Sequence, residues 1–175
     1  DTRQELRIFT CFLHQIQLAA FSAPDTYLVT FLYKCNSQCR TETSGTDYTI
    51  LEKFYNEAGI KTAIVTASNE EKMQRVLHTH PELATLFDRI LTSKDYANGK
   101  PAPDCYIEGA KAFGAHPEEC IVIEDSINGL RAGRDSGAFV VAVTTTNPHE
   151  VVAPLADHVI EHFNGTTLDG LWAKG

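Results

Sequence analysis

Long apolar runs are absent from this 175-residue sequence, and no hydrophobic stretch is long enough to cross a membrane. An excess of positive charge is absent too: 15 Lys and Arg residues face 23 Asp and Glu residues, and the net charge of -8 argues against a nucleic-acid partner. A signal peptide is not indicated, because Asp1 and Glu5 stand where a basic segment would be. These absences leave a globular domain large enough to bury a core.

An even, regularly spaced set of cysteines is also missing, which argues against a disulfide framework and favours a reduced, cytoplasmic chain. The five cysteines are Cys11, Cys35, Cys39, Cys105 and Cys120. The C-x-x-x-C pair at 35 and 39 has no second pair to complete a zinc site, so we interpret both as ordinary thiols. Because the sequence starts with Asp1 and its one methionine is Met73, we expect that an upstream segment was removed or never included.

Residues 1–46 differ in pattern from the rest of the chain. Apolar residues recur at helical spacing within 3–20 and predict an amphipathic helix, and the β-branched and aromatic run at 27–33 predicts a strand. The charges of this segment balance, so the whole net charge lies beyond it. We therefore predict a divergent N-terminal segment at 1–46 and an α/β core at 47–175.

From residue 48 onward, predicted helices and strands alternate. Helices are predicted at 48–58, 70–78, 104–113, 127–136 and 149–155, and strands at 60–66, 88–92, 120–123, 138–143 and 157–160. Such alternation is typical of βαβ units, and it predicts a three-layer, Rossmann-like parallel sheet with flanking helices.

Two adjacent carboxylates, Glu124 and Asp125, directly follow the apolar strand at 120–123. Open α/β sheets bind their ligands at the carboxyl ends of their strands. Two carboxylates crowded at that edge repel each other, and a hard cation such as Mg²⁺ would relieve the repulsion. The alternative is a solvated acidic turn, which is common on protein surfaces.

Two further polar sites also follow strands. Ser68 lies at the turn from the strand at 60–66 into a helix, where backbone N–H groups bind anions, although it could serve only as a helix cap. Lys100 lies in a proline-rich loop at 99–104 that would hold it beside the acidic pair, where it could neutralise phosphate charge. A solvated surface lysine is the alternative. Ser68, Lys100 and the acidic pair, found in this order along the chain, are together a more specific signal of function than any one of them alone.

These segments resemble the haloacid dehalogenase-like superfamily and, within it, the β-phosphoglucomutase-like phosphatase branch. Residues 63–68 look like its second motif, 99–104 like its third and 121–133 like its fourth. The resemblance covers about 48–163 and implies Mg²⁺-dependent phosphate transfer from a small phosphorylated metabolite, such as a sugar phosphate, through a phosphoaspartate.

The resemblance also implies residue roles. Ser68 and Lys100 would be catalytic: Ser68 would hold the phosphate oxygens, and Lys100 would bridge the phosphate and the nucleophile. Asn69 would add a phosphate contact. Asp125 and Glu124 would hold Mg²⁺.

The sequence departs from the family pattern at the first motif. No Asp-x-Asp occurs anywhere in the chain, so neither a nucleophile nor a general acid can be named. The cap domain of this branch is reduced or unrecognisable, and the helix within 3–20 is a candidate remnant. We expect the strand at 27–33 either to fill the central position of the sheet in place of the first-motif strand, or to leave a chain prone to association.

Three interpretations follow from this departure. The chain is a phosphatase or mutase that lacks its catalytic first strand, a non-catalytic relative that binds a phosphate ligand or a protein, or a hydrolase with an unfamiliar nucleophile such as Cys35. The last is the weakest, because no base is placed near that thiol.

Overall fold

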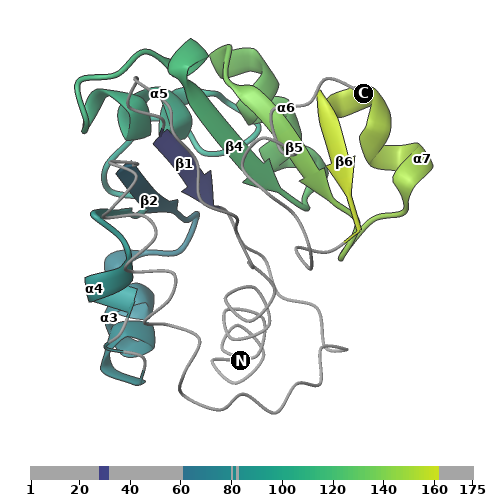
Figure 1. Cartoon of the computed structure of the whole chain (residues 1–175). Coiled ribbons are helices and arrows are strands. Elements are labelled where there is room, and N and C mark those ends of the chain that lie inside the picture. The colour runs from purple at the N-terminus through teal and green to yellow at the C-terminus, as the bar shows by residue number, and fades with distance from the viewer. Residues whose placement is uncertain (1–27, 32–60, 80, 82, 162–175) are drawn as a thin grey trace.

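The computed structural model describes residues 28–31, 61–79, 81 and 83–161, and within them six strands form one parallel sheet (Figure 1). The order across the sheet is β3-β2-β1-β4-β5-β6. The strands are β1 (Leu28–Phe31), β2 (Lys61–Val65), β3 (Arg89–Leu91), β4 (Cys120–Glu124), β5 (Phe139–Val143) and β6 (His158–Ile160). This arrangement confirms the predicted α/β parallel fold.

Strand β1 lies in the middle of the sheet and pairs in parallel with β2 on one side and β4 on the other. Phe31 stands opposite both Ile64 and Ile123. The described part of the strand predicted at 27–33 therefore occupies the central position. There it pairs with edges of β2 and β4 that would otherwise stay open.

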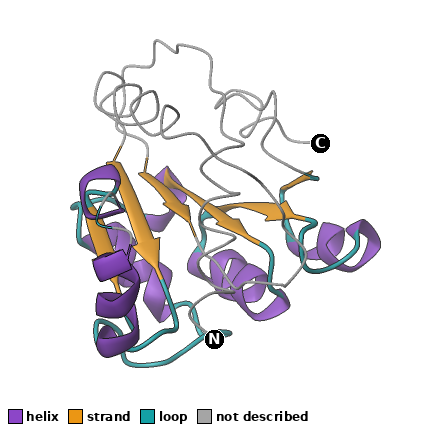
Figure 2. Cartoon of the chain, turned by 90° about the horizontal axis from the view of Figure 1, so that it is seen from below, coloured by secondary structure: helices purple, strands orange, loops and turns teal. Residues whose placement is uncertain are grey.

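Helices flank the sheet, which twists across its width (Figure 2). They are α3 (Glu70–Thr79), α4 (Leu83–Leu86), α5 (Asp104–Lys111), α6 (Ile127–Ser136) and α7 (His149–Val152), with 3-10 turns η1 (Pro117–Glu119) and η2 (Ala153–Leu155). The helix predicted at 149–155 is thus divided, and Pro154 is the second residue of η2. The sequence did not predict α4 or η1, since four and three residues are too few to show a helical period.

The boundaries of α6 confirm the sequence prediction. The Oγ atom of Ser126 accepts a hydrogen bond from the N–H of Gly129 at 3.1 Å, which caps the first turn. Gly137 ends the helix with φ 91°, a left-handed conformation that glycine adopts without strain.

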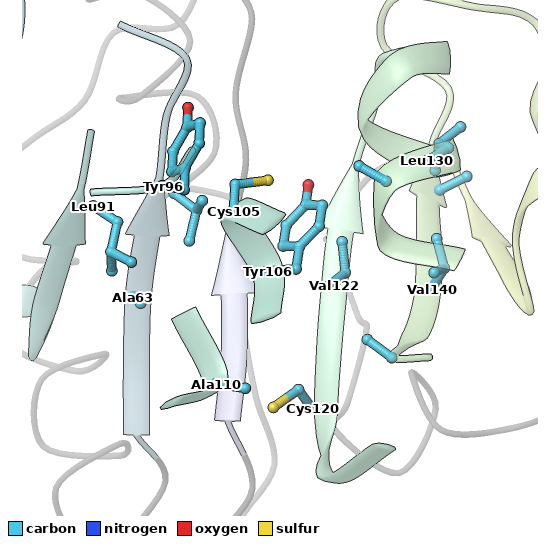
Figure 3. Close-up of a cluster of buried hydrophobic side chains, with 14 of the residues drawn as sticks. Ala63, Leu91, Tyr96, Cys105, Tyr106, Ala110, Cys120, Val122, Leu130 and Val140 are labelled. Carbon is cyan, nitrogen blue, oxygen red and sulfur yellow. The ribbon is translucent and has the colours of Figure 1, made fainter. Parts of the chain in front are cut away.

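A hydrophobic core fills the space between the sheet and helices α5 and α6 (Figure 3). Alternate strand residues, Ala63, Val65, Val122 and Val140, face this cluster because side chains along a strand point to opposite sides. Leu130 of α6 is fully buried against them. The packing fixes both helices, and with them the residues at their first turns, relative to the strand ends.

Several sequence predictions fall outside the described residues. They are the helix within 3–20, the cysteine pair at 35 and 39, and the helix at 48–58. The division of the chain at residue 46 stays a prediction for the same reason. In the part of the chain that is described, no helix is both long and apolar enough to cross a membrane.

Candidate active site

The carboxyl ends of β2 and β4 lie at the same level on the two sides of β1. Val65 and Glu124 each come one residue after the partner of Phe31, so the loops that follow them leave the sheet together. The first loop carries Ser68 and Asn69, and the second begins with Asp125. The sheet therefore brings these predicted site residues to one edge.

Lys100 reaches this edge through an ion pair with Glu124. Its Nζ atom lies 3.0 Å from Oε1 of Glu124, and the two side chains are 11% and 2% exposed. The hydroxyl of Tyr106 donates to the same Oε1 at 3.3 Å. The pair is shielded from water, so the attraction between its charges is stronger than in a surface pair.

The second oxygen of Glu124 is bound by the turn into α6. Oε2 accepts hydrogen bonds from the N–H of Asp125 at 2.9 Å, the N–H of Ser126 at 2.8 Å and the hydroxyl of Ser126 at 3.0 Å. A Cβ atom added to Gly129 would lie 1.9 Å from Oε1, so only glycine leaves room for the carboxylate. Both oxygens of Glu124 are thus engaged by donors of the protein itself.

Asp125 differs, because one of its carboxylate oxygens is left free. Oδ2 accepts from the hydroxyls of Thr145, at 3.3 Å, and Thr146, while Oδ1 is buried and has no hydrogen-bond partner among the described residues. The side-chain amide of Asn147 donates to the backbone carbonyl of Asp125 at 2.8 Å and ties down the loop after β5. Burial raises the pKa of Asp125 to about 6; the hydroxyl of Thr146 opposes this rise, and the charge of Glu124 adds to it.

Oδ1 of Asp125 is an oxygen atom that a divalent cation could bind. A buried carboxylate oxygen without a partner is costly, and a cation would supply the missing partner and favour the charged form. Within the described residues, no three His, Cys, Asp or Glu side chains gather as a complete ligand set. Oδ1 of Asp125 could therefore hold a divalent cation, and the roles of Asp125 and Glu124 as Mg²⁺ ligands both stay predictions.

The loop after β2 contains the residue that caps α3. Oδ1 of Asn69 accepts from the N–H of Lys72 at 2.9 Å, so Asn69 is the cap. Ser68 contributes its backbone, which accepts from the N–H of Ser93 at 3.1 Å and donates to Oγ1 of Thr66 at 3.1 Å. The capping alternative for Ser68 is thus taken by its neighbour, and phosphate binding by both residues stays a prediction.

Sequence reasoning missed five residues that build this site, namely Tyr106, Gly129, Thr145, Thr146 and Asn147. The threonines and the asparagine directly follow β5, so the rule that marked the other strand ends could have found them. Tyr106 carries no such signal, because an aromatic residue near the start of a helix is more often simply core.

Known proteins share this sequence pattern and this fold. The family model for haloacid dehalogenase-like hydrolases matches residues 39–137. Hexitol phosphatase A of Escherichia coli (strain K12) is 39% identical over 88 residues, which is 50% of this chain and 40% of that protein. The chain spans less than half of the length of the curated relatives it matches.

Two solved structures extend the similarity to three dimensions. CbbY from Rhodobacter sphaeroides, in complex with phosphate, matches with a TM-score of 0.60 and 29% identity over 70% of this chain and 56% of its own. A β-phosphoglucomutase from Clostridium difficile matches with a TM-score of 0.58 and 26% identity over 69% of this chain and 51% of its own. Both agree with the β-phosphoglucomutase-like branch that the motifs resemble. With more than half of its sequence matched by the family model, the chain belongs to the haloacid dehalogenase-like hydrolases.

Proposed function

We propose that this chain binds a small phosphate monoester, such as a sugar phosphate, and takes part in its Mg²⁺-dependent hydrolysis. The observation that carries this proposal is the buried Oδ1 of Asp125, which has no hydrogen-bond partner within the described part of the chain. Asp125 directly follows Glu124, the partner of Lys100, at the carboxyl edge of the sheet. The phosphatase name of one relative and the phosphate in the structure of another support this substrate class.

Each residue has a distinct role in the proposed site. Lys100 pairs with Glu124, and the further N–H groups of an ammonium are available to phosphate oxygens. Ser68 and the first turn of α3 would hold the same oxygens by hydroxyl and backbone N–H groups. Asp125 would hold Mg²⁺, which when bound would draw off negative charge from the phosphate. Glu124 would hold Lys100 in place through the ion pair.

These residues do not supply a nucleophile. The described part of the central strand, Leu28–Phe31, carries no carboxylate, and the sequence has no Asp-x-Asp. We propose that hydrolysis proceeds through a phosphoaspartate whose carboxylate this chain does not contain. The same observation favours a second candidate function, in which the chain binds a phosphate ligand or a protein partner without catalysing a reaction.

Hydrolysis of p-nitrophenyl phosphate by the purified chain tests whether a nucleophile is present after all. We expect no Mg²⁺-dependent turnover above that of Asp125→Asn. Asp135→Asn is the matched control, because this aspartate is exposed on α6. Turnover that needs Mg²⁺, persists in the control and is lost in Asp125→Asn would show that the chain holds its own nucleophile and would contradict the proposal on this point.

Binding of inorganic phosphate tests the site itself. In calorimetric titrations with Mg²⁺ present, we expect Lys100→Met to weaken phosphate binding about tenfold or more, since a charged donor is lost. Lys94→Met is the control, because this lysine pairs with Glu70 at the surface. Equal affinities for the Lys100 variant and the wild-type chain would refute both the phosphatase and the phosphate-binding proposals.

A further inference from the structure

Tyr106 contacts both members of the Lys100–Glu124 pair. Tyr106 is 2% exposed, and its hydroxyl lies 3.3 Å from Oε1 of Glu124. The Nζ atom of Lys100 lies 5.6 Å from the centre of its ring, within reach of a cation–π attraction. In Figure 3 the hydroxyl points toward the carboxyl ends of the strands, where the site lies.

The hydroxyl of Tyr106 and the ammonium of Lys100 share one acceptor atom. Oε1 of Glu124 receives both, while Oε2 is bound by the turn at Asp125 and Ser126. Burial and the nearby charge of Glu124 raise the pKa of Tyr106 well above its usual value, so the phenol stays a donor. A carboxylate oxygen that already accepts one hydrogen bond attracts a second donor less strongly.

We propose that Tyr106 is a positioning residue for Lys100, an inference that rests on the proposed function. Its hydroxyl takes part of the hydrogen-bonding capacity of Oε1, and its ring holds the ammonium beside the carboxylate. Lys100 is thereby kept at the sheet edge without being bound so tightly that it is withdrawn from phosphate. When the hydroxyl is removed, Lys100 is the one described donor left on Oε1, and it pairs with Glu124 more closely.

Tyr106→Phe removes the hydroxyl and keeps the ring. We expect its affinity for inorganic phosphate, measured by calorimetry with Mg²⁺, to fall about fivefold, the usual effect of one hydrogen bond. Ser136→Ala is the matched control, because it also removes a buried hydroxyl, one that donates to the carbonyl of Gly133 at 2.6 Å near the far end of α6. The control loses stability but keeps the phosphate affinity of the wild-type chain.

A double-variant cycle shows whether Tyr106 acts through Lys100. In the Lys100→Met background, the added Tyr106→Phe change should leave phosphate affinity unchanged within about twofold. An equal loss in both backgrounds would overturn the proposal, because the hydroxyl would then act on some other group. A purely structural role predicts a lower melting temperature with no change in affinity, which would overturn it as well.

Failure of the proposed function and failure of the role of Tyr106 give different results. If Lys100→Met binds phosphate as the wild-type chain does, the proposed function is wrong and this inference falls with it. If Lys100→Met weakens binding but Tyr106→Phe behaves as Ser136→Ala does, only the role of Tyr106 is wrong. Should Tyr106→Phe not fold, 3-fluorotyrosine placed at position 106 alone keeps the ring and makes a stronger donor. Phosphate affinity above that of the wild-type chain supports the proposal, and an unchanged or lower affinity overturns it.

Discussion

Gly129 lies on α6 directly against the carboxylate of Glu124, and its replacement by alanine tests how this buried site is packed. The new Cβ atom would lie 1.9 Å from Oε1, 2.0 Å from Cδ and 2.6 Å from Oε2 of Glu124. Contacts this short cannot persist, so the carboxylate must leave its place. Lys100 would then be left charged and 11% exposed without its partner.

The expected loss of stability is the balance of two effects. Alanine in place of glycine within a helix stabilises it by about 1 kcal/mol. Breaking a buried ion pair costs about 3–5 kcal/mol, because an uncompensated charge remains. Gly129→Ala should therefore lower the free energy of unfolding by about 2–4 kcal/mol.

Urea unfolding of the wild-type chain and four variants, namely Gly129→Ala, Asn128→Ala, Glu124→Ala and the double variant Glu124→Ala/Gly129→Ala, measures this loss and its cause. Asn128→Ala is the control for helix propensity, since this neighbour is exposed on α6. In a Glu124→Ala background the obstacle is absent, so Gly129→Ala should cost nothing or stabilise the chain. If Gly129→Ala is as stable as Asn128→Ala, or costs the same in both backgrounds, a clash with Glu124 does not determine the stability of the Gly129→Ala variant.

Three further predictions concern single side chains. Ser126→Ala should lower the free energy of unfolding in urea by about 1–2 kcal/mol, because the capping bond to Gly129 and the bond to Glu124 are lost together; no change would show that the cap is dispensable. Burial raises the pKa of Asp125 to about 6, so its charge destabilises the fold above the unfolded pKa. In denaturant titrations with Mg²⁺ chelated, Asp125→Asn should therefore be more stable than the wild-type chain at pH 8, and this difference in stability should vanish near pH 4. A difference that stays the same across this pH range would contradict the prediction. Partial burial of Asp88 opposes its ionisation, but hydrogen bonds from Thr62 and Lys61 outweigh the effect of burial and lower its pKa. The charge of Asp88 therefore stabilises the fold at neutral pH, and this effect is lost as the pH falls below about 4. Asp88→Asn should therefore destabilise the chain at pH 7 and lose that effect at pH 3, with melting temperature as the measurement.

The sequence by itself determined where α6 begins and ends and which residue types stand at the strand ends. Ser126 caps the helix and Gly137 ends it through bonds and backbone angles that involve only a few neighbouring residues. The alternation of apolar runs and helical periods likewise depends on local spacing, and it was enough to predict a parallel sheet. Because the loop after each parallel strand leaves the sheet at its carboxyl edge, the order and spacing of the predicted strands were sufficient to predict that Ser68, Lys100 and the acidic pair lie at one edge.

Tertiary structure alone decided which hydrogen-bond and ion-pair partners those residues have. Lys100 and Glu124 are 24 positions apart, and whether they touch depends on how α5 packs against the sheet. The same packing brings Tyr106 to Oε1 of Glu124, and the close approach of α6 makes Gly129 necessary. The free Oδ1 of Asp125 follows from which hydroxyls the loop after β5 can reach. Sequence patterns act over a few residues, whereas the identity of each donor and acceptor is set by contacts between elements far apart in the chain.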